Sequence, residues 1–112
     1  MRKKVYICLP DSADSGILNK ASRYTRYAIL CGTAPVVPHL FAPYIDESLK
    51  KEEVILELGQ SLLWYCDELW VFEDELQTDG TAEKVSFCQS LNIPVVTIKN
   101  AKLEKIIGGT SS

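Results

Sequence analysis

The sequence predicts a layered α/β domain: a doubly wound parallel sheet of about four strands with helices on both faces. Short runs rich in β-branched and aromatic residues lie near residues 4–9, 34–37, 68–73 and 94–98. Three of these runs lack polar alternation, as expected for strands of a parallel sheet that is covered on both faces. Segments of helical length separate the runs, which gives a β-α-β-α alternation. Right-handed crossovers and short connections then favour the strand order 2-1-3-4.

The first two helices are predicted from apolar residues that recur at helical spacing. The first covers roughly residues 17–31 and ends at Gly32, a residue type that commonly follows a helix. The second covers roughly residues 47–65, and Gly59 is placed to let it approach a neighbour closely. The positions expected to face inward are Ile17, Ala21, Tyr24, Ala28 and Cys31 in the first helix, and Ile55, Leu58, Leu62 and Leu63 in the second.

The third helix is predicted to follow Asp79-Gly80 and to stop at Asn92, just before Pro94. Residues 102–107 can form one more short helix. Glycine and serine dominate the last five residues, which is typical of a frayed end. We therefore expect one domain over residues 1–107 and a flexible tail over residues 108–112.

Composition and charge argue against several classes of partner. The chain has 112 residues and a formal net charge of −3, so it lacks the basic surface that nucleic acid or an anionic membrane attracts. No apolar run approaches the ~20 residues of a membrane-spanning helix, and the expected location is the cytoplasm. The cysteines, Cys8, Cys31, Cys66 and Cys88, show no metal-ligand spacing and lie in apolar segments, so we expect buried free thiols, with a disulfide as the alternative.

Ligands of such sheets bind outside the carboxyl ends of the strands, which here directs attention to the loops at 10–16, 38–47 and 73–80. His39 lies just past the second strand, where a hydrogen bond within the loop and a ligand contact are both open; a lone histidine is no metal site, and we expect none. The segment 78–84 either caps the third helix or holds a phosphate or carboxylate with its backbone N–H groups. The acidic residues around the third loop are either solvated or positioned for acid/base work at a sugar C1; these are Glu73, Asp74, Glu75, Asp79 and Glu83.

Four strings, in this order, resemble small bacterial and phage proteins related to nucleoside 2-deoxyribosyltransferases. They are VYICLP, NKASRYTRYAILCGTAPVVPHLFAPYID, LGQSLLWYCDELWVFE and DGTAEKVSFCQSLNIPVV, and the likeness extends from Val5 to Val96. The resemblance implies a three-layer flavodoxin-like (Rossmann-like) sheet, a nucleoside or nucleotide ligand, no cofactor and a homo-oligomer. The characterised relatives cleave an N-glycosidic bond by attack of a glutamate on the sugar C1.

Carried onto this chain, the resemblance implies specific site residues. Pro10, followed by Asp11, matches the end of the first strand near the sugar or phosphate. Lys84 occupies the position of the family's catalytic or substrate-holding glutamate, and Glu83 lies one residue earlier, rotated by ~100° on a helix. If the chain is active, Glu83 is the candidate nucleophile, and Asp79 or Asp74 protonates the leaving base. The other residues implied to bind substrate are Asn19, His39, Gly80 and Thr81.

Two readings of function therefore stand beside each other. In the first, the domain binds a nucleoside or nucleotide and retains weak or no transferase activity. In the second, it is a non-catalytic nucleotide-binding or oligomer-forming module, because the glutamate is shifted and a lysine has taken its place. The position of the Glu83 side chain, in the crevice or away from it, bears most directly on the choice.

Overall fold

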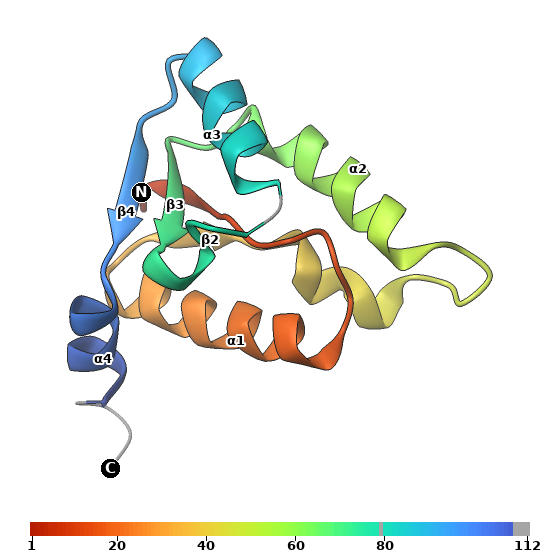
Figure 1. The fold of residues 1–112 in the computed structure, drawn as a ribbon, viewed down its shortest axis with the longest axis horizontal. Helices are drawn as coiled ribbons and strands as arrows, with labels where there is room; N and C mark the ends of the chain where they lie inside the picture. Colours follow the sequence, from red (N-terminus) through yellow and green to blue (C-terminus); the bar gives the residue numbers. More distant parts are fainter. Residues whose placement is uncertain (79, 109–112) are drawn as a thin grey trace.

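The computed structural model describes residues 1–78 and 80–108, and it forms a three-layer α/β sandwich of the flavodoxin-like type (Figure 1). The sheet is parallel with the order β2-β1-β3-β4, so the predicted fold class and strand order are confirmed. The strands are β1 (Lys4–Ile7), β2 (Ala34–Val36), β3 (Glu68–Phe72) and β4 (Val95–Ile98). The helices are α1 (Ser15–Leu30), α2 (Lys51–Leu63), α3 (Thr81–Ser90) and α4 (Asn100–Gly108), with short 3₁₀ helices η1 (Pro38–Tyr44) and η2 (Glu73–Glu75).

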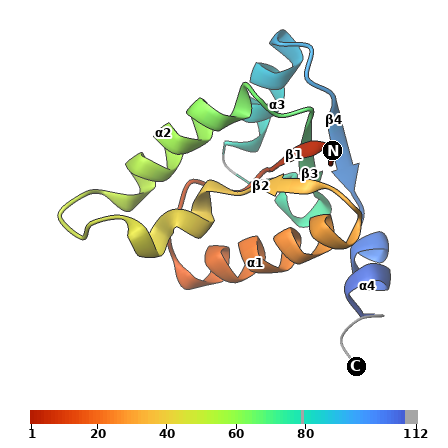
Figure 2. The same ribbon diagram turned by 180° about the vertical axis from the view of Figure 1, so that it is seen from behind.

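The helices form two layers, one on each face of the sheet. Figure 1 and the reverse view in Figure 2 both place α1 and α4 on one side and α2 and α3 on the other. Successive side chains of a strand point to opposite faces. Accordingly, Val5 and Ile7 pack in the core on the α1 side, whereas Tyr6 and Cys8 pack in the core on the α2 and α3 side. This two-sided burial explains why the strand sequences show no polar alternation.

The short strand β2 forms one edge of the sheet. Its central residue, Pro35, lies opposite Val5 of β1, and the N–H of Ala34 donates to the carbonyl of Lys3 at 2.8 Å. At the same end of the sheet, Asp67 accepts a hydrogen bond from the backbone N–H of Lys4 at 2.8 Å. The Asp67 carboxylate thus ties the start of β1 to the start of β3, far from the carboxyl edge.

Helix α1 begins with Asp14, whose carboxylate accepts from the N–H of Ile17 and satisfies one of the free donors at the helix start. Its buried side chains include Tyr24, whose ring stacks on Phe72 with centroids 3.9 Å apart. The predicted burial of Cys31 is wrong: it follows the last turn of α1 as the C-cap residue and is exposed. The expectation of free, buried thiols is confirmed for Cys8, Cys66 and Cys88.

Helix α2 starts at Lys51, four residues later than predicted. Residues before it form a turn in which Asp46 accepts from the N–H of Ser48 at 2.9 Å, so the carboxylate serves a loop and not the helix. The expected close approach at Gly59 is confirmed. A Cβ built on Gly59 would overlap the hydroxyl of Tyr6, so only glycine lets α2 lie this close to β1.

The C-terminal half follows the prediction with one change. Gly80 adopts φ +86° immediately before α3, and Asn92 adopts φ 59° after it, which ends the helix. Helix α4 is longer than the predicted 102–107, and Gly108, expected in the tail, is its last residue. The other residues of the predicted tail, 109–112, lie outside the described part. Within residues 1–78 and 80–108, no helix has the length and apolar character that crossing a bilayer requires.

Candidate functional site

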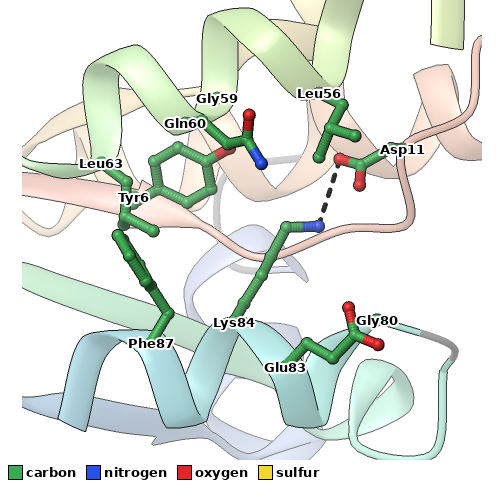
Figure 3. Close-up of a pocket in the computed structure, with 10 residues that line it drawn as sticks. All are labelled: Tyr6, Asp11, Leu56, Gly59, Gln60, Leu63, Gly80, Glu83, Lys84 and Phe87. Atoms are coloured by element: carbon green, nitrogen blue, oxygen red, sulfur yellow. Dashed lines mark hydrogen bonds and ion pairs between the residues drawn. The ribbon is translucent and has the colours of Figure 1, made fainter. Parts of the chain in front are cut away.

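A cavity of about 240 Å³ lies between α2 and α3, next to the carboxyl end of β1 (Figure 3). One wall is apolar, and the opposite end carries polar and charged side chains. The apolar wall consists of Tyr6, Leu63 and Phe87, and the opposite end carries Asp11, Glu83 and Lys84. Figure 3 shows Leu56 beside Asp11 and Gln60 beside Tyr6, and Gly59 and Gly80 complete the lining. This is the sheet edge at which ligands of doubly wound folds bind.

Lys84 crosses the polar end of the cavity from α3 to the loop after β1. Its Nζ lies 3.1 Å from Oδ1 of Asp11 and donates to the carbonyl of Leu9 at 3.0 Å. The Lys84 side chain is 15% exposed and that of Asp11 26% exposed, so solvent screens this ion pair less than it screens a surface pair. Figure 3 shows the lysine reaching from α3 toward Asp11 beneath Leu56.

His39 fixes the same loop from its other side. The ring is buried, and its Nε2–H donates to the carbonyl of Pro10 at 2.6 Å. The ring therefore carries its proton on Nε2, and Nδ1 is a buried acceptor with no partner among the described residues. Burial lowers the pKa of His39, because the charged imidazolium is poorly solvated there. Of the two roles open for His39, the hydrogen bond within the loops is the one observed.

Glu83 and Gly80 form the mouth of the cavity at the start of α3. Glu83 is exposed and lies in the first turn of the helix, where a carboxylate interacts favourably with the helix dipole. Figure 3 shows its carboxylate beside Gly80, on the opposite side of Lys84 from Tyr6. Glu83 therefore lines the cavity from the rim, while Lys84 occupies the more buried, central position.

Glu75 is fully buried, whereas the sequence left the acidic residues of that loop either solvated or positioned for acid/base work. Its Oε2 pairs with Lys20 at 3.0 Å and accepts from the hydroxyl of Tyr24 at 2.7 Å. Its backbone carbonyl accepts from the buried Thr81 hydroxyl at 2.8 Å. These contacts hold the loop before α3 against α1. Lys20 and Tyr24 are one helical turn apart, so the sequence indicates that they lie on the same face of α1. It does not indicate their partner Glu75, which lies on a loop some fifty residues away.

The other predicted site residues do not line the cavity. Asn19 is exposed on α1, and the Thr81 hydroxyl donates to the backbone carbonyl of Glu75. Asp74 accepts from the side chain of Asn100 at 2.9 Å, which places it toward α4. Asp79 lies outside the described residues. The cavity thus brings together Asp11, Gly80, Glu83 and Lys84 from the predicted set, with Pro10 and His39 fixing the loop behind them.

Two apolar residues of the cavity, Leu56 and Phe87, were not predicted from the sequence. Leu56 and Phe87 line the cavity while remaining partly exposed, 39% and 37% respectively. A pattern of apolar residues at helical spacing does not separate such positions from core positions. Gly59 was the residue from which this part of the cavity could have been predicted, because a glycine inside a helix indicates the close approach of another group. Among the described residues, no group of three or more His, Cys, Asp or Glu side chains is arranged to hold a metal ion.

Fold and cavity together define a small flavodoxin-like α/β domain with an amphipathic cavity at the carboxyl edge of its sheet. A family model with the description "Domain of unknown function (DUF7768)" matches residues 3–98, and the chain belongs to this family. Searches of curated proteins and of solved structures found no match.

Proposed function

We propose that the chain binds a nucleoside or nucleotide in the cavity between α2 and α3. The observation that carries the proposal is the division of the cavity into an apolar wall and a charged end at the carboxyl edge of a parallel sheet. A nucleoside has the same division, because a flat base is joined to a sugar that carries hydroxyl groups. Its base would lie against Phe87 and Leu63, and its sugar toward Asp11 and Lys84.

The size of the cavity supports a ligand of this kind. Its volume of about 240 Å³ is slightly below the ~300–1,000 Å³ typical of small-molecule sites. A single nucleoside fits such a volume, whereas a dinucleotide does not. Phe87 also makes an edge-to-face contact with Trp64, with ring centroids 6.0 Å apart, which orders the aromatic wall.

A titration followed by NMR tests the proposal. Deoxynucleosides and their 5′-monophosphates are added to the ¹⁵N-labelled full chain, and saturable shifts are expected for residues around Leu56, Gly80 and Phe87. Leu56→Trp should block the cavity and abolish these shifts. Leu49→Trp is the matched control, because Leu49 is also an exposed leucine (54%) but does not line the cavity. Absence of saturable binding by the wild-type chain would overturn the proposal.

An assembly role is the second candidate, and a specific surface favours it. Trp64 is 60% exposed and Tyr65 73% exposed at the end of α2. Large exposed aromatic side chains are typical of protein interfaces. We propose that two chains associate through this end of α2, in agreement with the oligomer that the sequence resemblance implies.

A further inference from the structure

The two positive features of the cavity are each already matched by a carboxylate of the chain itself. The ammonium of Lys84 is paired with Asp11 at 3.1 Å. The positive end of α3 has Glu83 in its first turn. Two carboxylates and one ammonium give the described charged residues of the cavity a net charge of −1. A phosphate group entering this end would meet no unpaired cation among them.

The backbone that carries Asp11 is fixed, so the carboxylate can leave Lys84 only by rotation of its own side chain. Three consecutive residues are held. The carbonyl of Leu9 accepts from Lys84, the carbonyl of Pro10 accepts from the buried His39, and Asp11 itself pairs with Lys84. Displacing the backbone of this loop would therefore break contacts to two other elements, α3 and η1.

An ion pair of this kind suits hydroxyl groups better than phosphate oxygens. The two contacts of Lys84 use two of its three N–H donors, and a carboxylate such as Asp11 accepts hydrogen bonds through both oxygens. A sugar hydroxyl both donates and accepts, so it can bond to both partners at once. A phosphate oxygen only accepts and adds negative charge beside Asp11.

We propose that Asp11 determines the charge of the ligand: by neutralising Lys84 it makes the cavity bind an uncharged nucleoside and reject the same nucleoside with a 5′-phosphate. This inference rests on the proposed function, since it specifies which members of that ligand class the site accepts. It also argues against phosphate binding by the segment 78–84, one of the roles that the sequence left open, because Asp11 lies against Lys84.

The experiment compares dissociation constants of one deoxynucleoside and its 5′-monophosphate, measured by isothermal titration calorimetry with the full chain. The wild-type chain is expected to bind the nucleoside at least about tenfold more tightly. Asp11→Asn frees Lys84 without a large change in side-chain volume. It is expected to shift the ratio of the two dissociation constants by about tenfold or more in favour of the monophosphate. Adding Lys84→Met to that variant should cancel the gain.

Two control variants separate pairing from net charge. Glu83→Gln removes one negative charge from the cavity but leaves Lys84 paired, so it should shift the ratio less than Asp11→Asn. Glu47→Gln removes the same charge at an exposed position outside the cavity and should leave the ratio unchanged. If Asp11→Asn does not fold, the salt dependence of the wild type serves instead. The preference of the wild-type chain for the nucleoside over the monophosphate should become smaller at high ionic strength, because salt screens the repulsion between the phosphate and the carboxylates of the cavity.

Each result bears on one level of the proposal. If neither ligand binds the wild-type chain, the proposed function itself is overturned. If the monophosphate binds as tightly as the nucleoside or more tightly, the nucleoside-binding proposal stands and the inference about charge is overturned. Asp11 does not determine the charge of the ligand if the nucleoside is preferred but Asp11→Asn leaves the ratio of the two dissociation constants unchanged. The same holds if that ratio, measured for the wild-type chain, does not change with salt concentration.

Discussion

Gly59→Ala should destabilise the chain through its contact with Tyr6, even though alanine is the better helix former. A Cβ at residue 59 would overlap the hydroxyl of Tyr6, and Tyr6 is only 2% exposed in β1, so the ring has little room to move. Overpacking of this kind costs ~1–3 kcal/mol. The gain in helix propensity from glycine to alanine is about 1 kcal/mol. The free energy of unfolding should therefore fall by up to about 2 kcal/mol.

Removing the hydroxyl should reverse the sign of this effect. With phenylalanine at residue 6, the nearest atoms to the new Cβ become the ring carbon Cζ at 3.5 Å and Cγ of Pro38 at 3.7 Å. Both are ordinary van der Waals distances. In the Tyr6→Phe background, Gly59→Ala should then be neutral or stabilising by up to ~1 kcal/mol, the propensity gain alone.

Urea denaturation of the wild type, the two single variants and the double variant gives the coupling energy between residues 6 and 59. We expect a coupling of about 1–3 kcal/mol, with Gly59→Ala less harmful when Tyr6 is absent. The reasoning would be refuted if Gly59→Ala were more stable than the wild type, or if its effect on the free energy of unfolding were the same in both backgrounds. Either result would mean that α2 is not held against the Tyr6 hydroxyl.

Four further outcomes are expected. His39 is the single histidine of the chain, and burial lowers its folded-state pKa below the unfolded value of ~6.5. The stability contributed by the neutral His39 ring is therefore complete above about pH 6.5 and is lost as the pH falls. Urea denaturation from pH 7 to 5.5 should show a decline in the free energy of unfolding that is missing in His39→Gln. Titration with a thiol reagent should find one fast-reacting thiol, Cys31, in the native chain and four in the unreduced, unfolded chain; two in the latter would reveal a disulfide. Light scattering at micromolar concentration should give about twice the 12.5 kDa of one chain for the wild type and a smaller mass for Trp64→Glu, whereas a monomeric wild type contradicts the assembly role. Chromatographic assays should find weak or no base exchange on deoxynucleosides, since the Glu83 carboxylate lies at the cavity rim, and rapid turnover that Glu83→Ala abolishes and Lys84→Ala spares would disprove this.

The sheet was predictable because its signals are local. The apolar runs of β1, β3 and β4 are buried on both faces, and short connections leave few ways to order the strands. The helix boundaries were less predictable where a polar side chain had two possible uses. The second helix was predicted to start near residue 47, but Asp46 closes a turn there and α2 begins at Lys51.

The place of the site in the fold could be predicted from the sequence, but its chemistry could not. The rule that ligands bind at the carboxyl edge of the strands selected the loop after β1 and the start of α3, where the cavity lies. Contacts that decide its chemistry join residues far apart in the chain: Lys84 with Asp11, and Glu75 with Lys20. No periodicity or short motif carries information on such pairs, so a neutralised lysine and a buried glutamate could not be expected from the sequence.

Pro35 has a consequence for how this sheet meets other chains. Because the N–H of Ala34 points toward β1, the neighbouring nitrogen of Pro35 faces the open edge, and it carries no hydrogen. An extended segment from another molecule that aligned beside β2 would find no donor at the centre of a three-residue strand. Natural sheets use proline at edges in this way to prevent edge-to-edge aggregation. Growth of the sheet by added strands is thus disfavoured at β2, and the opposite edge, β4, is where the chain would be open to it.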